Sequence, residues 1–317
     1  MQGLEIPSIG MITLAIIQAL IMLALAPLFT GLSRVIRAKM HSRQGPGVLQ
    51  DYRDLYKLLR RQDVAPSPSG MIFSITPWVL IITMALVAMA MPAVTNQSPF
   101  PIAGDVITDI YLFAIFRFFF ALSGLDSGSV FAGLGSSREL TLGVLVEPTL
   151  ILSVFTVALI TGSSDLGHIS TTLATLPWIA PVATVVAGAA CAFVIFIEMG
   201  KLPFDVAEAE QELQEGPMTE YSGSGLALMK IGLGLKQMVV VQLFLAIFIP
   251  FGKAETLTIS ALLIATIWLL VKLFVCFSIA SVLENSMARV RYVQTHELTW
   301  VGFGIAVLGF LFYLTGL

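Results

Sequence analysis

Long apolar segments recur along the chain and alternate with shorter polar ones. Each apolar segment is close to the ~20 residues that an α-helix needs to cross a bilayer. We therefore predict an all-α membrane protein, a bundle of about eight transmembrane helices that forms a single integral membrane domain over residues 1–317. The predicted spans cover roughly residues 9–31, 72–92, 105–122, 140–161, 180–198, 228–250, 258–282 and 298–316.

Positive charge alternates between the loops. The loops after spans one, three, five and seven carry twelve Lys or Arg residues, whereas those after spans two, four and six carry one, Lys253. The positive-inside rule then predicts a bacterial inner membrane protein with both termini in the periplasm. We expect partners to bind the cytoplasmic loops, which cover about residues 32–71, 123–139, 199–227 and 283–297. The first span lacks a basic leader and a convincing cleavage site, so we expect it to be retained.

Composition excludes a soluble domain, because the chain is 57% hydrophobic and 12% charged, with a mean hydropathy of +0.91. Cys191 and Cys276 each lie in an apolar span, and their spacing suggests neither an iron–sulfur nor a zinc site. The sequence has no phosphate-binding loop, nucleophile elbow or HExxH motif. We expect no catalytic residue, metal, redox centre or cofactor in this chain, and no nucleic-acid partner.

An acidic stretch, residues 198–223, follows the fifth span. It contains seven acidic residues and a single cation, Lys201. Pro203 suits the first turn of a helix, and on such a helix Glu208, Glu212 and Glu215 would share one face. Like charges one turn apart are unfavourable unless cations meet them or some carboxyls keep a proton. We interpret the stretch as a docking or proton-handling site; the alternative is a solvated acidic loop.

The first cytoplasmic loop is the basic counterpart of this acidic stretch, with eight Lys or Arg between residues 34 and 61. Apolar residues at helical spacing from Leu49 to Leu59 predict an amphipathic helix at the membrane interface. Its cations could anchor anionic lipid, or they could pair with the acidic stretch. The opposite charges favour pairing. The arm-docking or charge-pairing candidates are Arg37, Arg43, Asp54, Lys57, Arg138 and Glu220.

Several charged residues lie at membrane depth, where each costs ~2.5–3.5 kcal/mol at a helix centre. Asp109 and Arg117 lie two turns apart on one face of span three, and Glu147 precedes Pro148 in span four, where a proline permits a kink or water. Such groups suit a proton relay; static ion pairs that hold the bundle together are the alternative. The relay candidates are Glu147, Glu198, Asp205, Glu208, Glu210, Glu212, Lys230 and Lys236.

Two long motifs carry a family resemblance over most of the chain. PFDVAEAEQEL at 203–213, with TEYSG at 219–223, and GVLQDYRDLYKLLRRQ at 47–62 resemble the signatures of the membrane subunit that forms the quinone chamber of complex I, the respiratory NADH dehydrogenase. The RQGP turn at 43–46 and the GSSR segment at 135–138 match further motifs of that family. Eight spans agree with this family as well.

The finer resemblance is to the membrane-anchor subunits of group 4 [NiFe]-hydrogenases in formate hydrogenlyase, in particular the hydrogenase-4 type. It rests on MHSRQGPG at 40–47, ALSGLDSGS at 121–129, EMGKLPFD at 198–205 and ENSMAR at 284–289. A shortened turn after Arg43, and Ser33 where the quinone subunit carries a glutamate, both depart from complex I in the region of the quinone entrance.

This resemblance implies a non-catalytic subunit that anchors a cytoplasmic arm and couples hydrogen evolution to proton or sodium movement. The implied partners are a [NiFe] large subunit, an iron–sulfur small subunit and ferredoxin-like subunits, which would hold the metal clusters, together with antiporter-like membrane subunits, a formate dehydrogenase and the lipid bilayer. The alternative from a different class is the quinone-chamber subunit of a complex I-like NADH:quinone oxidoreductase.

Overall fold

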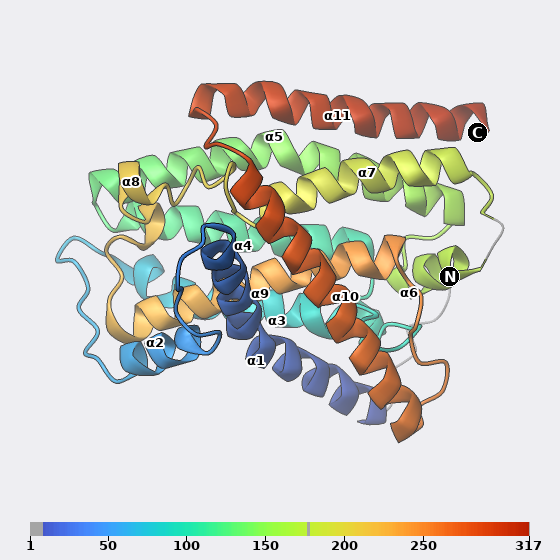
Figure 1. The fold of residues 1–317 in the computed structure, drawn as a ribbon, viewed down its shortest axis with the longest axis horizontal. Coiled ribbons are helices and arrows are strands. Elements are labelled where there is room, and N and C mark those ends of the chain that lie inside the picture. The colour runs from blue at the N-terminus through green and yellow to red at the C-terminus, as the bar shows by residue number, and fades with distance from the viewer. Residues whose placement is uncertain (1–8, 176–177, 317) are drawn as a thin grey trace.

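The computed structural model describes residues 9–175 and 178–316, and these residues form an all-α membrane protein (Figure 1). Eight helices are long and apolar enough to cross a membrane, as the apolar segments predict. The long helices are α1 (Ile9–Met40), α3 (Met71–Ala90), α4 (Val106–Asp126), α5 (Val130–Thr161), α7 (Pro181–Glu198), α9 (Gly223–Phe248), α10 (Ile259–Ser286) and α11 (Tyr292–Thr315). The prediction that the N-terminus lies in the periplasm falls on residues 1–8, which lie outside the described residues.

Short elements gather at the two ends of the bundle. They are α2 (Gln50–Leu59), α6 (Leu166–Ala174), α8 (Glu210–Leu213) and the 3₁₀ turns η1 (Pro101–Ala103) and η2 (Gly216–Met218). Helices α2 and α8 lie at the left-hand end in Figure 1 and α6 at the right-hand end. The predicted amphipathic helix is therefore confirmed as α2. The Asp51 carboxylate ties it to α1, because it pairs with Arg34 at 2.8 Å and accepts a hydrogen bond from Thr30 at 2.7 Å.

Helix α9 is the centre of the bundle. In its most apolar stretch 72% of the residues are buried inside the chain, compared with 22% for α10 and for α11. Helix α10 crosses obliquely in front of the other spans, and α11 lies at the edge beside α5 and α7 (Figure 1). A polar side chain on α9 is therefore shielded by protein, whereas the outer faces of α10 and α11 are left to lipid or to other subunits.

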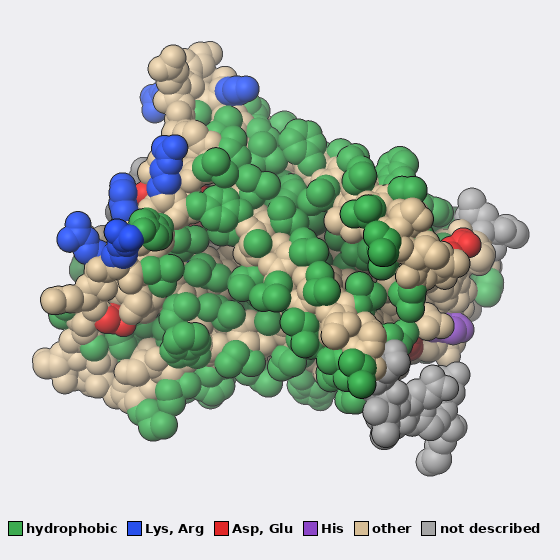
Figure 2. All heavy atoms as spheres, turned by 90° about the horizontal axis from the view of Figure 1, so that it is seen from below, with side chains coloured by type: hydrophobic (Ala, Val, Ile, Leu, Met, Phe, Trp, Pro, Cys, Tyr) green, Lys and Arg blue, Asp and Glu red, His purple; other side chains and the backbone are tan. Residues whose placement is uncertain are grey.

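The surface divides into an apolar belt and one basic end. Hydrophobic side chains cover the middle of the face in Figure 2, and Lys and Arg side chains gather at its left-hand edge. Such a belt is what a bilayer requires, because lipid cannot satisfy polar groups. The protein is thus a multi-pass membrane protein.

Two helices extend beyond the predicted spans into residues assigned to cytoplasmic loops. Helix α1 continues to Met40, and α5 begins at Val130 instead of near residue 140. The added turns of α5 include the segment GLGSSRE. Its small and charged residues have low hydropathy, so a search for apolar segments leaves it out of the span. The polar side chains find partners, because Arg138 pairs with Glu212 and Glu139 with Arg117.

The predicted acidic helix after Pro203 is wrong in its extent. Only the four residues of α8 are helical, and the rest of the stretch turns repeatedly. Ala209, Gln214 and Glu215 have positive φ values of 23°, 51° and 72°, which a continuous right-handed helix cannot contain. Glu208, Glu212 and Glu215 consequently do not share one helical face.

Two glycines let this folded stretch approach α5 closely. Gly216 has a φ of +53°, and a Cβ there would lie 2.0 Å from the carbonyl oxygen of Ala207. A Cβ on Gly135 would lie 2.8 Å from the same oxygen and 2.8 Å from the Cα of Gly216. Backbone therefore packs against backbone at this point, where only glycine fits.

We predict that Gly135→Ala destabilises the protein by ~1–3 kcal/mol, because the added methyl group must displace backbone. Gly133→Ala on the same helix is the matched control: its nearest neighbour would be 4.0 Å from the new Cβ. That change should stabilise α5 by ~0.5–1 kcal/mol. Thermal unfolding of both variants in detergent checks this, and equal midpoints would contradict the close packing.

Candidate functional site

A buried arginine is the centre of the polar interior. Arg117 on α4 is 7% exposed, and its guanidinium donates to three glutamates on two other helices. Glu139 and Glu147 come from α5, with Glu139 at 3.4 Å, and Glu198 comes from the end of α7. A guanidinium has five N–H donors in a fixed plane, so one arginine can serve several carboxylates.

Lys236 of α9 completes this group. Its ammonium lies 3.0 Å from Glu198 and 3.9 Å from Glu139, and 5.5 Å from the ring centroid of Phe116. We call Arg117, Glu139, Glu147, Glu198 and Lys236 the Arg117 cluster. Four helices contribute to it: α4, α5, α7 and α9.

The cluster has two cations and three carboxylates, so its formal charge is −1 when every group is ionised. Uptake of one proton would make it neutral. A buried network in which each charge is paired tolerates its desolvation, whereas removal of one partner leaves an uncompensated charge. The paired charges can therefore hold four helices of the bundle together.

The structure brings together three of the relay candidates, Glu147, Glu198 and Lys236. Sequence reasoning missed Glu139, because the fourth predicted span begins at residue 140 and leaves Glu139 in a loop. Its spacing of eight residues from Glu147, about two helical turns, was the available signal. Lys272, a further charged residue within the predicted seventh span, lies elsewhere: its ammonium donates to the Ile249 carbonyl at 2.7 Å, just after the end of α9.

Three cavities lie near the Arg117 cluster or between it and the end of the bundle that holds α2 and α8. A cavity of about 40 Å³ touches four members of the Arg117 cluster. A second, of about 270 Å³, lies between α1, α2 and α9, and a third, of about 540 Å³, is lined mostly by charged and polar residues. Glu208 lines all three cavities. Its carboxyl group is therefore shared by the cavity beside the cluster and the two larger cavities.

Burial raises the pKa of Glu208 to about 8, and the nearby acids Asp205, Glu139 and Glu215 act in the same direction. The positive charge of Lys236 opposes them. At neutral pH such a carboxyl carries a proton that it can give up when its surroundings change. Glu208 combines a raised pKa with contact with the 40 Å³ cavity beside the cluster.

The other acids of the stretch pair with cations from several elements. Asp205 accepts from Arg289 at 2.8 Å, and Glu212 from Arg138 at 2.8 Å. The Arg138 hydrogen bond lowers the pKa of the exposed Glu212 carboxyl. Glu215 lies 3.7 Å from Lys230, a relay candidate that is exposed at the start of α9. The backbone of Glu210 begins α8, but its side chain lies outside the described residues.

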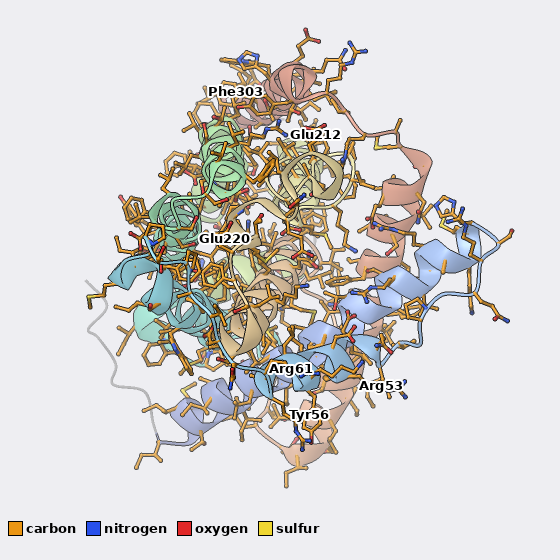
Figure 3. All side chains as sticks on the ribbon, turned by 90° about the vertical axis from the view of Figure 1, so that its left-hand side faces the viewer. Arg53, Tyr56, Arg61, Glu212, Glu220 and Phe303 are labelled. Atoms are coloured by element: carbon orange, nitrogen blue, oxygen red, sulfur yellow. The ribbon has the colours of Figure 1, made fainter. Side chains whose placement is uncertain are left out.

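Among the described residues, no ion pair joins the basic first loop to the acidic stretch, contrary to the expected pairing. Arg34 pairs with Asp51, and Lys57 lies 3.9 Å from Asp54, so these charges are matched within the loop. In the end-on view of Figure 3, Arg53 and Arg61 lie along the lower edge, well away from Glu212. Cations from α5, α9 and residue 289 neutralise the acids instead, which removes the need for the first loop.

A smaller buried group lies at the end of α10. Glu284 pairs with Arg37 of α1 and lies 3.8 Å from Lys201. Burial, together with the positive charge of Arg37, lowers the pKa of Lys201 to about 7. Arg37 thus pairs within the chain. Arg43 is exposed and Glu220 is partly exposed, as docking residues would be.

Comparison with known proteins agrees with this architecture. A family described as NADH dehydrogenase matches residues 12–314. The chain belongs to this family. It is 59% identical over 307 residues to hydrogenase-4 component C of Escherichia coli (strain K12), covering 97% of each chain. It is 54% identical over 296 residues to formate hydrogenlyase subunit 4 of the same organism, covering 93% of this chain and 96% of the relative.

More distant members of the NADH dehydrogenase family include a subunit of the NADH-quinone oxidoreductase of Ehrlichia canis (strain Jake), 30% identical over 293 residues, covering 85% of this chain and 78% of the relative. A chain from the structure of an archaeal respiratory membrane complex, the membrane-bound sulfane sulfur reductase, has the same fold, with a TM-score of 0.83. It is 23% identical, and the match covers 96% of this chain and all of that one. The archaeal chain shows the shared fold, and the similarity to the Ehrlichia canis subunit fits a chain that works within a larger membrane complex.

We predict a pH dependence that belongs to Glu208. Its pKa is higher in the folded protein than the ordinary value of 4.5, so between about pH 4.5 and 8 the folded state binds more protons than the unfolded chain. Stability should therefore fall as the pH rises through this window. Glu208→Gln should flatten that slope and remove a protonated-carboxyl infrared band that titrates near pH 8. Glu212→Gln, at an exposed carboxyl, should leave the band in place.

Proposed function

We propose that this chain is the membrane subunit of a formate hydrogenlyase-type group 4 [NiFe]-hydrogenase complex. It anchors the cytoplasmic hydrogenase arm and couples hydrogen evolution to proton or sodium movement. The near full-length similarity to hydrogenase-4 component C and formate hydrogenlyase subunit 4 supports this proposal. The observation that carries the coupling role is the Arg117 cluster, which is buried in the bundle and reached from the charged end by way of Glu208.

The charged end supplies the docking face in this proposal. It faces the cytoplasm, and both termini face the periplasm, because Lys and Arg are concentrated at that end. The arm consists of a [NiFe] large subunit, an iron–sulfur small subunit and ferredoxin-like subunits, which hold the metal clusters. Antiporter-like membrane subunits pack beside the exposed apolar helices, and a formate dehydrogenase supplies electrons. Exposed Arg43 and partly exposed Glu220 are in position for such contacts.

The coupling is electrostatic. A change of charge in the arm alters the free energy of the proton on Glu208, and each pKa unit corresponds to ~1.36 kcal/mol. Glu208 passes the proton through the 40 Å³ cavity, and the Arg117 cluster accepts it because one proton neutralises its charge of −1. Glu147, with 35% of its side chain exposed, is the least buried carboxyl of the cluster.

We predict that Glu147→Gln and Glu198→Gln leave assembly intact and strongly reduce hydrogen-linked proton movement, because the amide keeps the shape of the side chain but carries no proton. Inverted membrane vesicles with a pH-sensitive dye measure that movement, and hydrogen production is followed in parallel with an uncoupler present. Glu297→Gln, at an exposed residue of α11, is the control. Parent-like proton movement in both cluster variants would refute the relay.

A purely structural docking role predicts a different pattern. Charge-neutralising changes at Glu208 and Glu212 would then detach the arm from the membrane without altering uncoupled turnover. Co-purification of the arm with the membrane subunit measures this directly. Retention of the arm, together with reduced proton movement in Glu208→Gln, supports the relay instead.

The quinone-chamber function is the second candidate, and one cavity favours it. The 270 Å³ cavity between α1, α2 and α9 has an apolar wall that includes Leu55, Leu58 and Ile231. The similarity to the NADH-quinone oxidoreductase subunit of Ehrlichia canis points the same way. Against it, Ser33 lines the neighbouring 540 Å³ cavity where the quinone subunit family has a glutamate. A quinone that co-purifies with the complex, or inhibition by quinone-site blockers, would favour this function.

A further inference from the structure

A second buried acid lies at the opposite end of the bundle from the charged loops. Asp109 is in the first turn of α4 and is 1% exposed. Neither oxygen of its carboxyl group has a hydrogen-bond partner among the described residues. This differs from the Arg117 cluster, where each carboxyl group has a cation beside it.

Asp105, one helical turn earlier, is the charged group that acts on Asp109. One of its oxygens, Oδ1, is likewise buried without a partner among the described residues, although the residue as a whole is partly exposed. Its backbone forms a bridge with Asp165 at the N-terminus of α6, which lies at the right-hand end in Figure 1. Asp105 therefore connects the buried carboxyl with the loops at this end.

No cation of the described residues forms an ion pair with Asp105 or Asp109, and Lys253, the cation nearest α6 at this end, donates instead to Ser170 and to the Ala246 carbonyl. Helix α3 contains no acidic or basic residue. On α5, Arg138 pairs with Glu212, and Glu139 and Glu147 belong to the Arg117 cluster. The Asp165 carboxylate accepts the backbone N–H of His168 at 2.7 Å and so caps α6. An unpaired carboxylate in such surroundings is costly, and it adds nothing to packing that a leucine would not provide.

An apolar layer separates Asp109 from the Arg117 cluster. The two residues lie on one face of α4, eight residues and about 12 Å apart along the axis. A small cavity of about 10 Å³ touches Arg117, Glu147 and Glu198, and its other lining residues, Ile110, Phe113, Leu150, Ile195, Val240 and Leu243, are all apolar. The chain thus has two polar sites with an apolar interval between them.

We propose that Asp109 is a proton-exchanging carboxyl at the end of the bundle away from the docking face, and that Asp105 links it to the solvent on that side. The protonated, neutral form of Asp109 is stable in this apolar site. The ionised form is costly there, so it exists only briefly between the loss of one proton and the uptake of the next, unless a cation takes the place of the proton. This deepens the proposed coupling function and rests on it, because it names a second proton-exchanging site, on the far side of the apolar layer from the Arg117 cluster.

The first test uses the assembled parent complex in native membranes and N,N′-dicyclohexylcarbodiimide, a lipophilic reagent that modifies protonated carboxyl groups. Peptide mass spectrometry should locate the modification on Asp109, and its rate should fall as the pH rises. An unmodified Asp109 would overturn the proposal. Protection by sodium chloride, but not by choline chloride, at constant pH would identify a sodium ion as the occupant and would equally overturn the proton assignment.

The second test is Asp109→Asn in vesicles, with Glu255→Gln at an exposed residue of the same end as the control. We expect loss of hydrogen-linked proton movement with uncoupled hydrogen production retained, and no loss in the control. If Glu198→Gln abolishes the movement and Asp109→Asn does not, the inner relay stands and this proposal falls. If neither variant changes it, both fall. Should Asp109→Asn fail to assemble, the labelling of the parent protein decides.

Discussion

One guanidinium holds the polar interior of this bundle together. Arg117 binds three glutamates from two helices, and Lys236 approaches two of these acids, Glu139 and Glu198, from a third helix. Four spans therefore meet at one charged point in an otherwise apolar interior. Each acid in the cluster is acceptable in lipid only because these two cations are present, so the spans must be placed to bring them together. The position of α9 at the centre of the bundle follows from this requirement as much as from its apolar residues.

The same constraint explains why the acidic stretch folds as it does. A regular helix would have stacked its glutamates along one face, with no cations on that face. The observed turns distribute Asp205, Glu212 and Glu215 to three separate cations and leave Glu208 at the junction of the cavities. Much of the negative charge is thereby neutralised within the chain, and Glu208, whose pKa burial raises to about 8, lines the cavity beside the buried cluster.

Sequence reasoning recovered what local pattern controls. The eight spans and α2 follow from apolar periodicity. Glu147, Glu198 and Lys236 were selected because a charged side chain at membrane depth is costly and so indicates a partner or a function. Tertiary contacts decided the rest. Glu139 is invisible to hydropathy because it lies in a polar turn of α5, and the turns after Pro203 depend on positive φ values and on the contact between Gly135 and Gly216. The partners of Arg117 come from other helices, so its own helix could not reveal them.

The glycine contact has a mechanical consequence. Gly216 of the acidic stretch rests directly on Gly135, which is one helical turn before Glu139 on the same helix. No flexible side chain lies between the two backbones to absorb a displacement. A subunit that grips the stretch and shifts it would push α5 as a rigid rod and alter the distance between Glu139 and Lys236. A movement of the acidic stretch, and not only a change of its charge, can therefore alter the geometry of the Arg117 cluster inside the membrane.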